Sequence, residues 1–179
     1  MKINQMTKCA LFTAIISVCA IISIPLPGGV PLSLATLAVY MCALILPPLS
    51  AGISAAVYVL LVAVGIPVTA SGGAGLSYLV GPTGGYIIGY LFTAVLVSAL
   101  VNGKLGRSRV KMVIALILGT LATYIPGTIW FCFVMKTTVA VALTKCVVPF
   151  LPGDAIKIVA AMELAKRLYQ LFSRVKKSA

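Results

Sequence analysis

The sequence predicts an all-α, polytopic membrane protein built as a single domain over residues 1–179, and three observations favour this fold class. Hydrophobic side chains make up 61% of the chain and charged side chains 9%. Because a soluble domain carries about a quarter charged residues, this chain has too little polar surface to cover a globule in water. Breaks at Pro and Gly also separate six apolar segments, and six transmembrane helices of about 20 residues fit within this length.

Each predicted helix is bounded by a break in the apolar pattern. The first ends at Pro25-Leu26-Pro27-Gly28-Gly29, a turn without a signal-peptide cleavage pattern. Pro47-Pro48 leaves almost no loop between the second and third helices, which predicts a tight antiparallel hairpin. In order, the six predicted helices cover about residues 8–25, 34–46, 49–66, 84–102, 112–134 and 150–172.

The positive charges predict the orientation of these helices in the cell membrane. Most cations lie before the first helix, between the fourth and the fifth, or at the end of the sixth: Lys2, Lys8, Lys104, Arg107, Arg109, Lys111, Lys166, Arg167, Arg174, Lys176 and Lys177. The opposite face has only Lys136 and Lys145, so the positive-inside rule places both termini in the cytoplasm. The net charge of +12 is therefore typical of membrane topology, and we expect no nucleic-acid partner.

The residue inventory argues against an enzyme. The chain has no His, two acidic residues and five Cys, none of them in a C-x-x-C pair. We therefore expect no metal centre, no cofactor and no hydrolase triad. The chain also has no nucleotide-binding motif, so ATP would act only through partner subunits.

Asp154 and Lys157 are the first candidate binding residues. A charge at membrane depth costs about 2.5–3.5 kcal/mol or more, so such residues usually face a cavity or a partner. The i,i+3 spacing puts both side chains on one face of the predicted sixth helix, where they can pair. One interpretation is a ligand site that opens outward. In the other, Asp154 caps a helix that starts after Pro152-Gly153, and Lys157 neutralises it.

The glycine-rich stretch 65–85 is the second candidate. Such a long, apolar loop is expected to fold back over the bundle as a binding element or a lid. Its last part, Gly81-Pro82-Thr83-Gly84-Gly85-Tyr86, would bring backbone N–H groups close to a ligand at a helix start. Tyr86 and Tyr90 share a helix face. Their side chains would either line a pocket or lie in the interfacial aromatic belt.

Small residues mark one face of the first helix. Ala10 and Ala14 have the small-xxx-small spacing that lets another helix approach closely. The partner is either another protein or a helix of the same bundle.

Four stretches, in this order and spacing, resemble the BioY family, the substrate-binding S components of energy-coupling factor (ECF) biotin transporters. They are Ala10-Leu11-Phe12-Thr13-Ala14, then Ile22-Ser23-Ile24-Pro25-Leu26-Pro27-Gly28-Gly29-Val30-Pro31, then Gly72-Gly73-Ala74-Gly75 with Gly81-Pro82-Thr83-Gly84-Gly85-Tyr86, and Phe150-Leu151-Pro152-Gly153-Asp154-Ala155-Ile156-Lys157. The resemblance runs from about residue 8 to 165.

The resemblance implies a six-helix S-component bundle in the lipid bilayer that binds biotin beneath its outer loops. The implied ligand residues are Asp154 and Lys157 together with Gly73, Gly75, Thr83, Gly84 and Tyr86. Ala10 and Ala14 would contact a membrane-embedded T component, and two ATPase subunits would drive transport.

Two positions depart from the family pattern. Ala35 stands where Gln is common, and Pro47-Pro48 stands where Gly-Pro is more usual. The loss of a polar side chain at position 35 keeps open an S component for another vitamin, such as lipoate or thiamine. The remaining alternative is a membrane scaffold protein in which Asp154 and Lys157 form only a buried ion pair.

Overall fold

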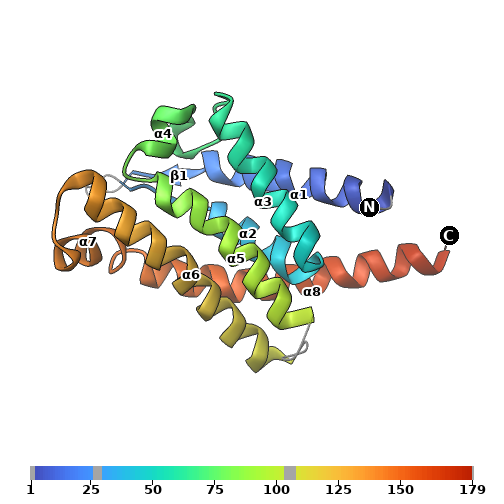
Figure 1. Ribbon diagram of the computed structural model, residues 1–179. Helices are drawn as coiled ribbons and strands as arrows, with labels where there is room; N and C mark the ends of the chain where they lie inside the picture. The colour runs from blue at the N-terminus through green and yellow to red at the C-terminus, as the bar shows by residue number, and fades with distance from the viewer. Residues whose placement is uncertain (1–2, 26–29, 103–107, 179) are drawn as a thin grey trace.

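Six helices of 11 to 28 residues dominate the computed structural model, which describes residues 3–25, 30–102 and 108–178 (Figure 1). They are α1 (Ile3–Ile21), α2 (Ala35–Ile45), α3 (Pro48–Ala63), α5 (Gly84–Asn102), α6 (Arg109–Met135) and α8 (Leu151–Ser178). Their order and approximate positions follow the six predicted helical segments. Only two residues connect α2 and α3, as the Pro47-Pro48 break predicts.

The first helix ends earlier than predicted because a short strand pair follows it. α1 stops at Ile21, and β1 (Ser23–Ile24) pairs antiparallel with β2 (Leu32–Ser33). The Leu34 N–H extends this pairing by donating to the Ile22 carbonyl at 3.1 Å. Residues 26–29, which complete the predicted turn, lie outside the described residues.

The third helix is also shorter than predicted, and three short helical elements were not predicted. α3 ends at Ala63 because Gly65 has a φ of +98°, a left-handed conformation that interrupts the helix. The 3₁₀ helix η1 (Ala70–Gly72) and α4 (Leu76–Val80) lie in the glycine-rich stretch, and α7 (Val139–Cys146) precedes α8. Elements this short have too few residues to give a clear helical period.

The chain is a multi-pass membrane protein, although its helices differ in their ability to cross a bilayer. α1, α5 and α6 are long and apolar enough to cross alone, and α7 with α8 forms a further candidate span bent by 53°. α2 and α3 have 11 and 16 residues. At 1.5 Å per residue, α2 is about half as long as the hydrocarbon core is thick. Six complete spans therefore remain a prediction.

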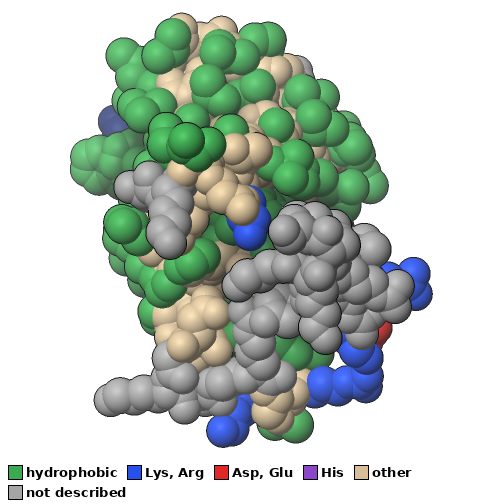
Figure 2. Space-filling model, turned by 90° about the vertical axis from the view of Figure 1, so that its right-hand side faces the viewer, with side chains coloured by type: hydrophobic (Ala, Val, Ile, Leu, Met, Phe, Trp, Pro, Cys, Tyr) green, Lys and Arg blue, Asp and Glu red, His purple; other side chains and the backbone are tan. Residues whose placement is uncertain are grey.

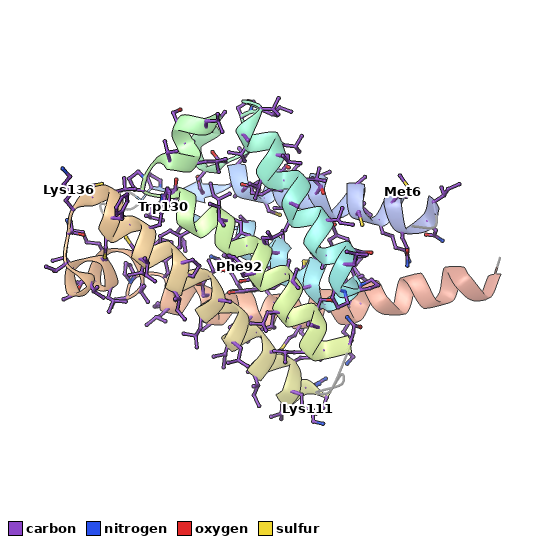
Figure 3. The ribbon with its side chains drawn as sticks, in the orientation of Figure 1. Met6, Phe92, Lys111, Trp130 and Lys136 are labelled. Atoms are coloured by element: carbon purple, nitrogen blue, oxygen red, sulfur yellow. The ribbon has the colours of Figure 1, made fainter. Side chains whose placement is uncertain are left out.

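Both ends of the described chain lie at the same end of the bundle, as an even number of passes requires (Figure 1). Met6 and Lys111 lie toward this end, whereas Lys136 lies at the opposite end of α6 (Figure 3). Figure 2 views the terminal end, where Lys and Arg side chains gather around its lower part. The charge count predicts that this end faces the cytoplasm.

Glycines allow the close packing of α5 against α6. A Cβ added at Gly85 would lie 2.3 Å from the Trp130 Cβ, and one added at Gly89 would lie 2.9 Å from the Thr123 Cα. A Cβ at Gly127 would lie 2.3 Å from the Tyr86 ring. Small residues at helix interfaces let membrane helices approach in this way. Tyr86 on α5 is thereby held against α6.

The short helix α2 lies at the centre of the bundle, where it contacts α1, α5 and α8. Ala38, Val39 and Cys42 are completely buried. A helix that is apolar on all sides is expected in such a buried position. Its N-terminal turn, with Thr36, therefore lies inside the bundle beside α8.

Candidate functional site

Asp154 and Lys157 form a buried ion pair in the first turns of α8. The Lys157 Nζ lies 2.9 Å from the Asp154 Oδ1, and the two residues are 6% and 3% exposed. The Tyr124 hydroxyl of α6 donates to the Asp154 Oδ2, and Lys157 donates to the Thr36 hydroxyl of α2 at 2.9 Å. Three helices therefore hold one neutral pair of opposite charges.

The structure shows the pairing of Asp154 with Lys157, which both interpretations allow, but not a capping role for Asp154. α8 begins at Leu151, and the Asp154 N–H already donates to the Phe150 carbonyl at 2.8 Å. The carboxylate bonds to side chains of α6 and α8 rather than to backbone N–H groups at the helix start. The capping interpretation was therefore wrong, because Pro152 and Gly153 lie within the first turn of the helix.

The ion pair retains hydrogen-bonding capacity for a ligand. A lysine ammonium has three donors, and two of the Lys157 donors are used by Asp154 and Thr36. Each Asp154 oxygen accepts one bond and can accept another. The pair thus presents a donor beside an acceptor, which complements the N–H and C=O of an amide or urea.

A cavity of about 30 Å³ lies against this pair, and we call it the ion-pair cavity. Most of its lining residues come from α2, α6, α7, α8 and the turn before α8: Thr36, Thr123, Tyr124, Cys146, Phe150, Asp154 and Lys157. The remaining wall consists of Val30, Pro31, Ser33, Tyr86 and Tyr90. Aromatic walls around a few polar groups are typical of small-molecule sites.

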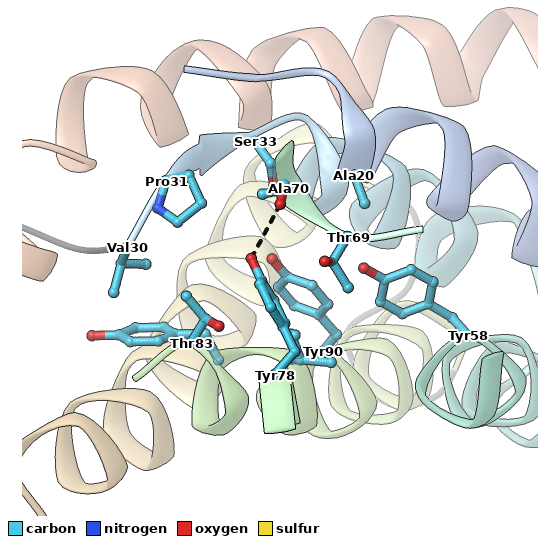
Figure 4. A pocket seen from close by; sticks show the side chains of 12 residues that line it. Ala20, Val30, Pro31, Ser33, Tyr58, Thr69, Ala70, Tyr78, Thr83 and Tyr90 are labelled. Atoms are coloured by element: carbon cyan, nitrogen blue, oxygen red, sulfur yellow. Dashed lines mark hydrogen bonds between the residues drawn. The ribbon is translucent and has the colours of Figure 1, made fainter. Parts of the chain in front are cut away.

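A second cavity of about 30 Å³ adjoins the first and shares these five wall residues (Figure 4). Its other lining residues are Ala20, Tyr58, Thr69, Ala70, Tyr78, Thr83 and Ile87, and we call it the tyrosine cavity. The Tyr78 hydroxyl donates to the Ala70 carbonyl at 3.3 Å. The glycine-rich stretch therefore folds back over the bundle, as the sequence predicts, and covers this cavity.

The predicted ligand residues fall into two groups. Asp154, Lys157, Tyr86, Tyr90 and Thr83 all line one or both cavities. Their convergence from α5, α8 and the preceding loop is what the sequence predicts for a shared site.

The predicted glycines shape the cover instead of lining either cavity. Gly75 has a φ of +85° where α4 begins. A Cβ on Gly73 would overlap the Tyr78 ring, and one on Gly84 would overlap the Leu79 carbonyl. Any contact of these three backbones with a ligand remains a prediction.

Sequence reasoning missed Tyr124, Thr36 and Tyr58. Each lies in a largely apolar helix that carries other Ser, Thr or Tyr residues. Which of these polar residues reaches the site depends on how the helices pack. A buried tyrosine usually finds a partner for its hydroxyl, so the tyrosines within apolar segments were the available signal.

Apolar helices around a buried ion pair define a multi-pass membrane protein with polar cavities inside its bundle. The model of the BioY family matches residues 1–174. The chain belongs to the BioY family.

Relatives from bacteria support this assignment along the whole chain. The biotin transporter BioY of Thermotoga maritima is 36% identical over 168 residues, which cover 94% of this chain and 97% of the relative. The biotin transporter BioY2 of Lactococcus lactis is 31% identical and covers 98% of this chain and 96% of the relative. These relatives are named as transporters and not as enzymes.

A solved structure shows the same fold. The crystal structure of the S-component for biotin from an ECF-type ABC transporter matches with a TM-score of 0.86 and 29% identity. The match covers 94% of this chain and 92% of that one. The chain therefore has the S-component fold that the sequence predicts.

Proposed function

We propose that this protein is the biotin-binding S component of an ECF transporter in the cell membrane. It captures biotin at the face opposite the termini and carries it across with a T component and two ATPase subunits. The observation that carries the proposal is the buried Asp154–Lys157 pair beside two adjoining cavities with aromatic walls. Its family membership and its likeness to a biotin S component support the same ligand.

The chemistry of biotin suits this site. Its cyclic urea has two N–H donors and a carbonyl, its fused rings are largely apolar, and its tail ends in a carboxylate. The Asp154–Lys157 pair can accept and donate at once, and the tyrosine rings can enclose the apolar part. Because the pair is neutral overall, it can remain buried before the ligand arrives.

The cover of the site must move for biotin to enter. Each cavity measures about 30 Å³, whereas pockets that enclose small ligands measure about 300–1,000 Å³. The most movable walls are the chain around β2 and the glycine-rich stretch with α4, since neither is part of a long helix. Outward movement of these segments would join the two cavities into one pocket.

Equilibrium binding of labelled biotin to the purified protein in detergent tests the proposal. We expect saturable binding that unlabelled biotin displaces and that lipoate and thiamine do not. Displacement by lipoate or thiamine would assign another vitamin. A folded sample that binds none of the three would favour the scaffold alternative.

The exposed face of α1 is the proposed T-component interface. Ala10 and Ala14 are exposed, and the larger apolar side chains Met6 and Val18 on the same helix are 58% and 61% exposed. Small residues on an exposed face allow a partner helix to approach the backbone closely. This chain has no nucleotide-binding motif, so energy for transport would arrive through such a contact.

Replacing Ala10 and Ala14 by leucine tests this interface. We expect the double variant to bind biotin with unchanged Kd but to lose about tenfold or more in co-purification with the T component and in biotin uptake, because the bulkier side chains separate the helices. Ala140→Leu, at an exposed alanine of α7, is the matched control. Equal uptake by the double variant and the control would exclude this face.

A further inference from the structure

The Tyr58 side chain of α3 is buried without a hydrogen-bond partner. The residue is 1% exposed, and no hydrogen bond among the described residues involves its hydroxyl. Its ring packs against that of Tyr90, with centroids 6.3 Å apart. Burying an unpaired hydroxyl is unfavourable, so phenylalanine would serve packing alone better at this position.

The hydroxyl of Tyr58 points into the tyrosine cavity. Figure 4 shows it turned toward the other labelled side chains, next to Thr69 and on the same side as the Tyr90 ring. Its neighbours are already engaged: Thr69 donates to the Gly73 carbonyl at 2.5 Å, and Tyr78 donates to the Ala70 carbonyl. Tyr58 therefore keeps a donor for something that enters the cavity.

The two cavities differ in what they can hold. The ion-pair cavity offers both a donor and an acceptor through Asp154 and Lys157. The tyrosine cavity has aromatic walls and the free hydroxyls of Tyr58 and Thr83, and no charged residue lines it among the described part of the chain. A ligand with polar groups at two ends, long enough to pass Tyr86 and Tyr90, would use both.

We propose that the tyrosine cavity is a second subsite of the same ligand pocket, in which the Tyr58 hydroxyl donates to an oxygen at the end of the ligand remote from the Asp154–Lys157 pair. This inference rests on the proposed function. For biotin, the acceptor is either the urea carbonyl or the carboxylate of the tail. Both are oxygen acceptors that a phenol can bind.

The test compares Tyr58→Phe with Tyr40→Phe. The Tyr40 hydroxyl is bonded to that of Thr120 at 2.7 Å and lines neither cavity. We expect Tyr58→Phe to raise the Kd for biotin about five- to tenfold while the thermal unfolding temperature stays the same or rises. Tyr40→Phe should leave the Kd unchanged and lower the unfolding temperature. If Tyr58 had a purely structural role, Tyr58→Phe would not weaken biotin binding while leaving the unfolding temperature unchanged or higher.

The analogue 2-iminobiotin, which lacks the urea oxygen, distinguishes the two acceptors. If Tyr58→Phe no longer weakens binding of this analogue, the urea carbonyl lies at Tyr58; if the loss persists, the carboxylate lies there. Equal biotin affinity of Tyr58→Phe and the wild type overturns the second subsite and leaves the proposed function intact. Failure of the wild-type protein to bind biotin overturns both.

Discussion

Replacing Asp154 by asparagine is expected to abolish biotin binding and to lower the free energy of unfolding by about 3–5 kcal/mol. The change leaves the Lys157 ammonium buried without a compensating negative charge. It also removes the negatively charged group that accepts the hydrogen bond of the Tyr124 hydroxyl. The expected affinity loss is more than about a hundredfold, measured as the Kd for labelled biotin.

A double variant separates the structural part of this effect from the binding part. Asp154→Asn combined with Lys157→Gln removes both charges, so most of the lost stability should return, because no isolated charge stays buried. Biotin binding should not return. If the double variant binds biotin like the wild type, the pair serves folding alone and the site assignment is wrong.

Exchange of the two residues gives a further control. Asp154→Lys with Lys157→Asp keeps one charge of each sign on the same helix face at i,i+3. A pair with only a structural role should tolerate the exchange better than a ligand site. We expect a folded protein without biotin binding, checked by size-exclusion chromatography together with the Kd.

Replacing Gly84 by alanine is expected to destabilise the protein by about 3 kcal/mol or more, at the upper end of what overpacking usually costs. The added Cβ would lie 1.5 Å from the Leu79 carbonyl oxygen, a backbone atom that cannot rotate away. The start of α5 must then move away from α4. Tyr86 and Tyr90 would shift with it, so biotin affinity should fall in the same variant.

Gly153→Ala is the matched control for this substitution. Its added Cβ would meet only the Leu32 side chain, at 3.4 Å, in ordinary contact. Because alanine is the better helix former, stability should stay constant or rise by up to about 1 kcal/mol. Thermal unfolding of both variants in detergent measures the difference. A Gly84→Ala protein as stable as Gly153→Ala would show that the α4–α5 turn is looser than the structure indicates.

The long helices could be predicted from the sequence because membrane helices follow local rules. Pro47-Pro48 separates α2 from α3, the glycine-rich stretch separates α3 from α5, and apolar length sets the spans. The pairing of Asp154 with Lys157 could also be predicted from the local sequence, because an i,i+3 spacing places both residues on the same face of one helix.

The rest of the site depends on contacts between distant segments. Tyr124 reaches Asp154 from 30 positions away, and Thr36 reaches Lys157 from 121 positions away. Nothing in the apolar pattern around these residues specifies which helix each one faces. The capping interpretation of Asp154 failed for a different, local reason, because α8 begins at Leu151 and includes Pro152 and Gly153 in its first turn.

The shared location of the two chain ends has a practical consequence for protein engineering. α1 begins and α8 ends at the same end of the bundle, opposite α4 and α7, which cover the cavities (Figure 1). A fluorescent reporter attached to either end would thus leave the ligand entrance free. Two copies could likewise be joined head to tail by a flexible peptide that never has to cross the bilayer.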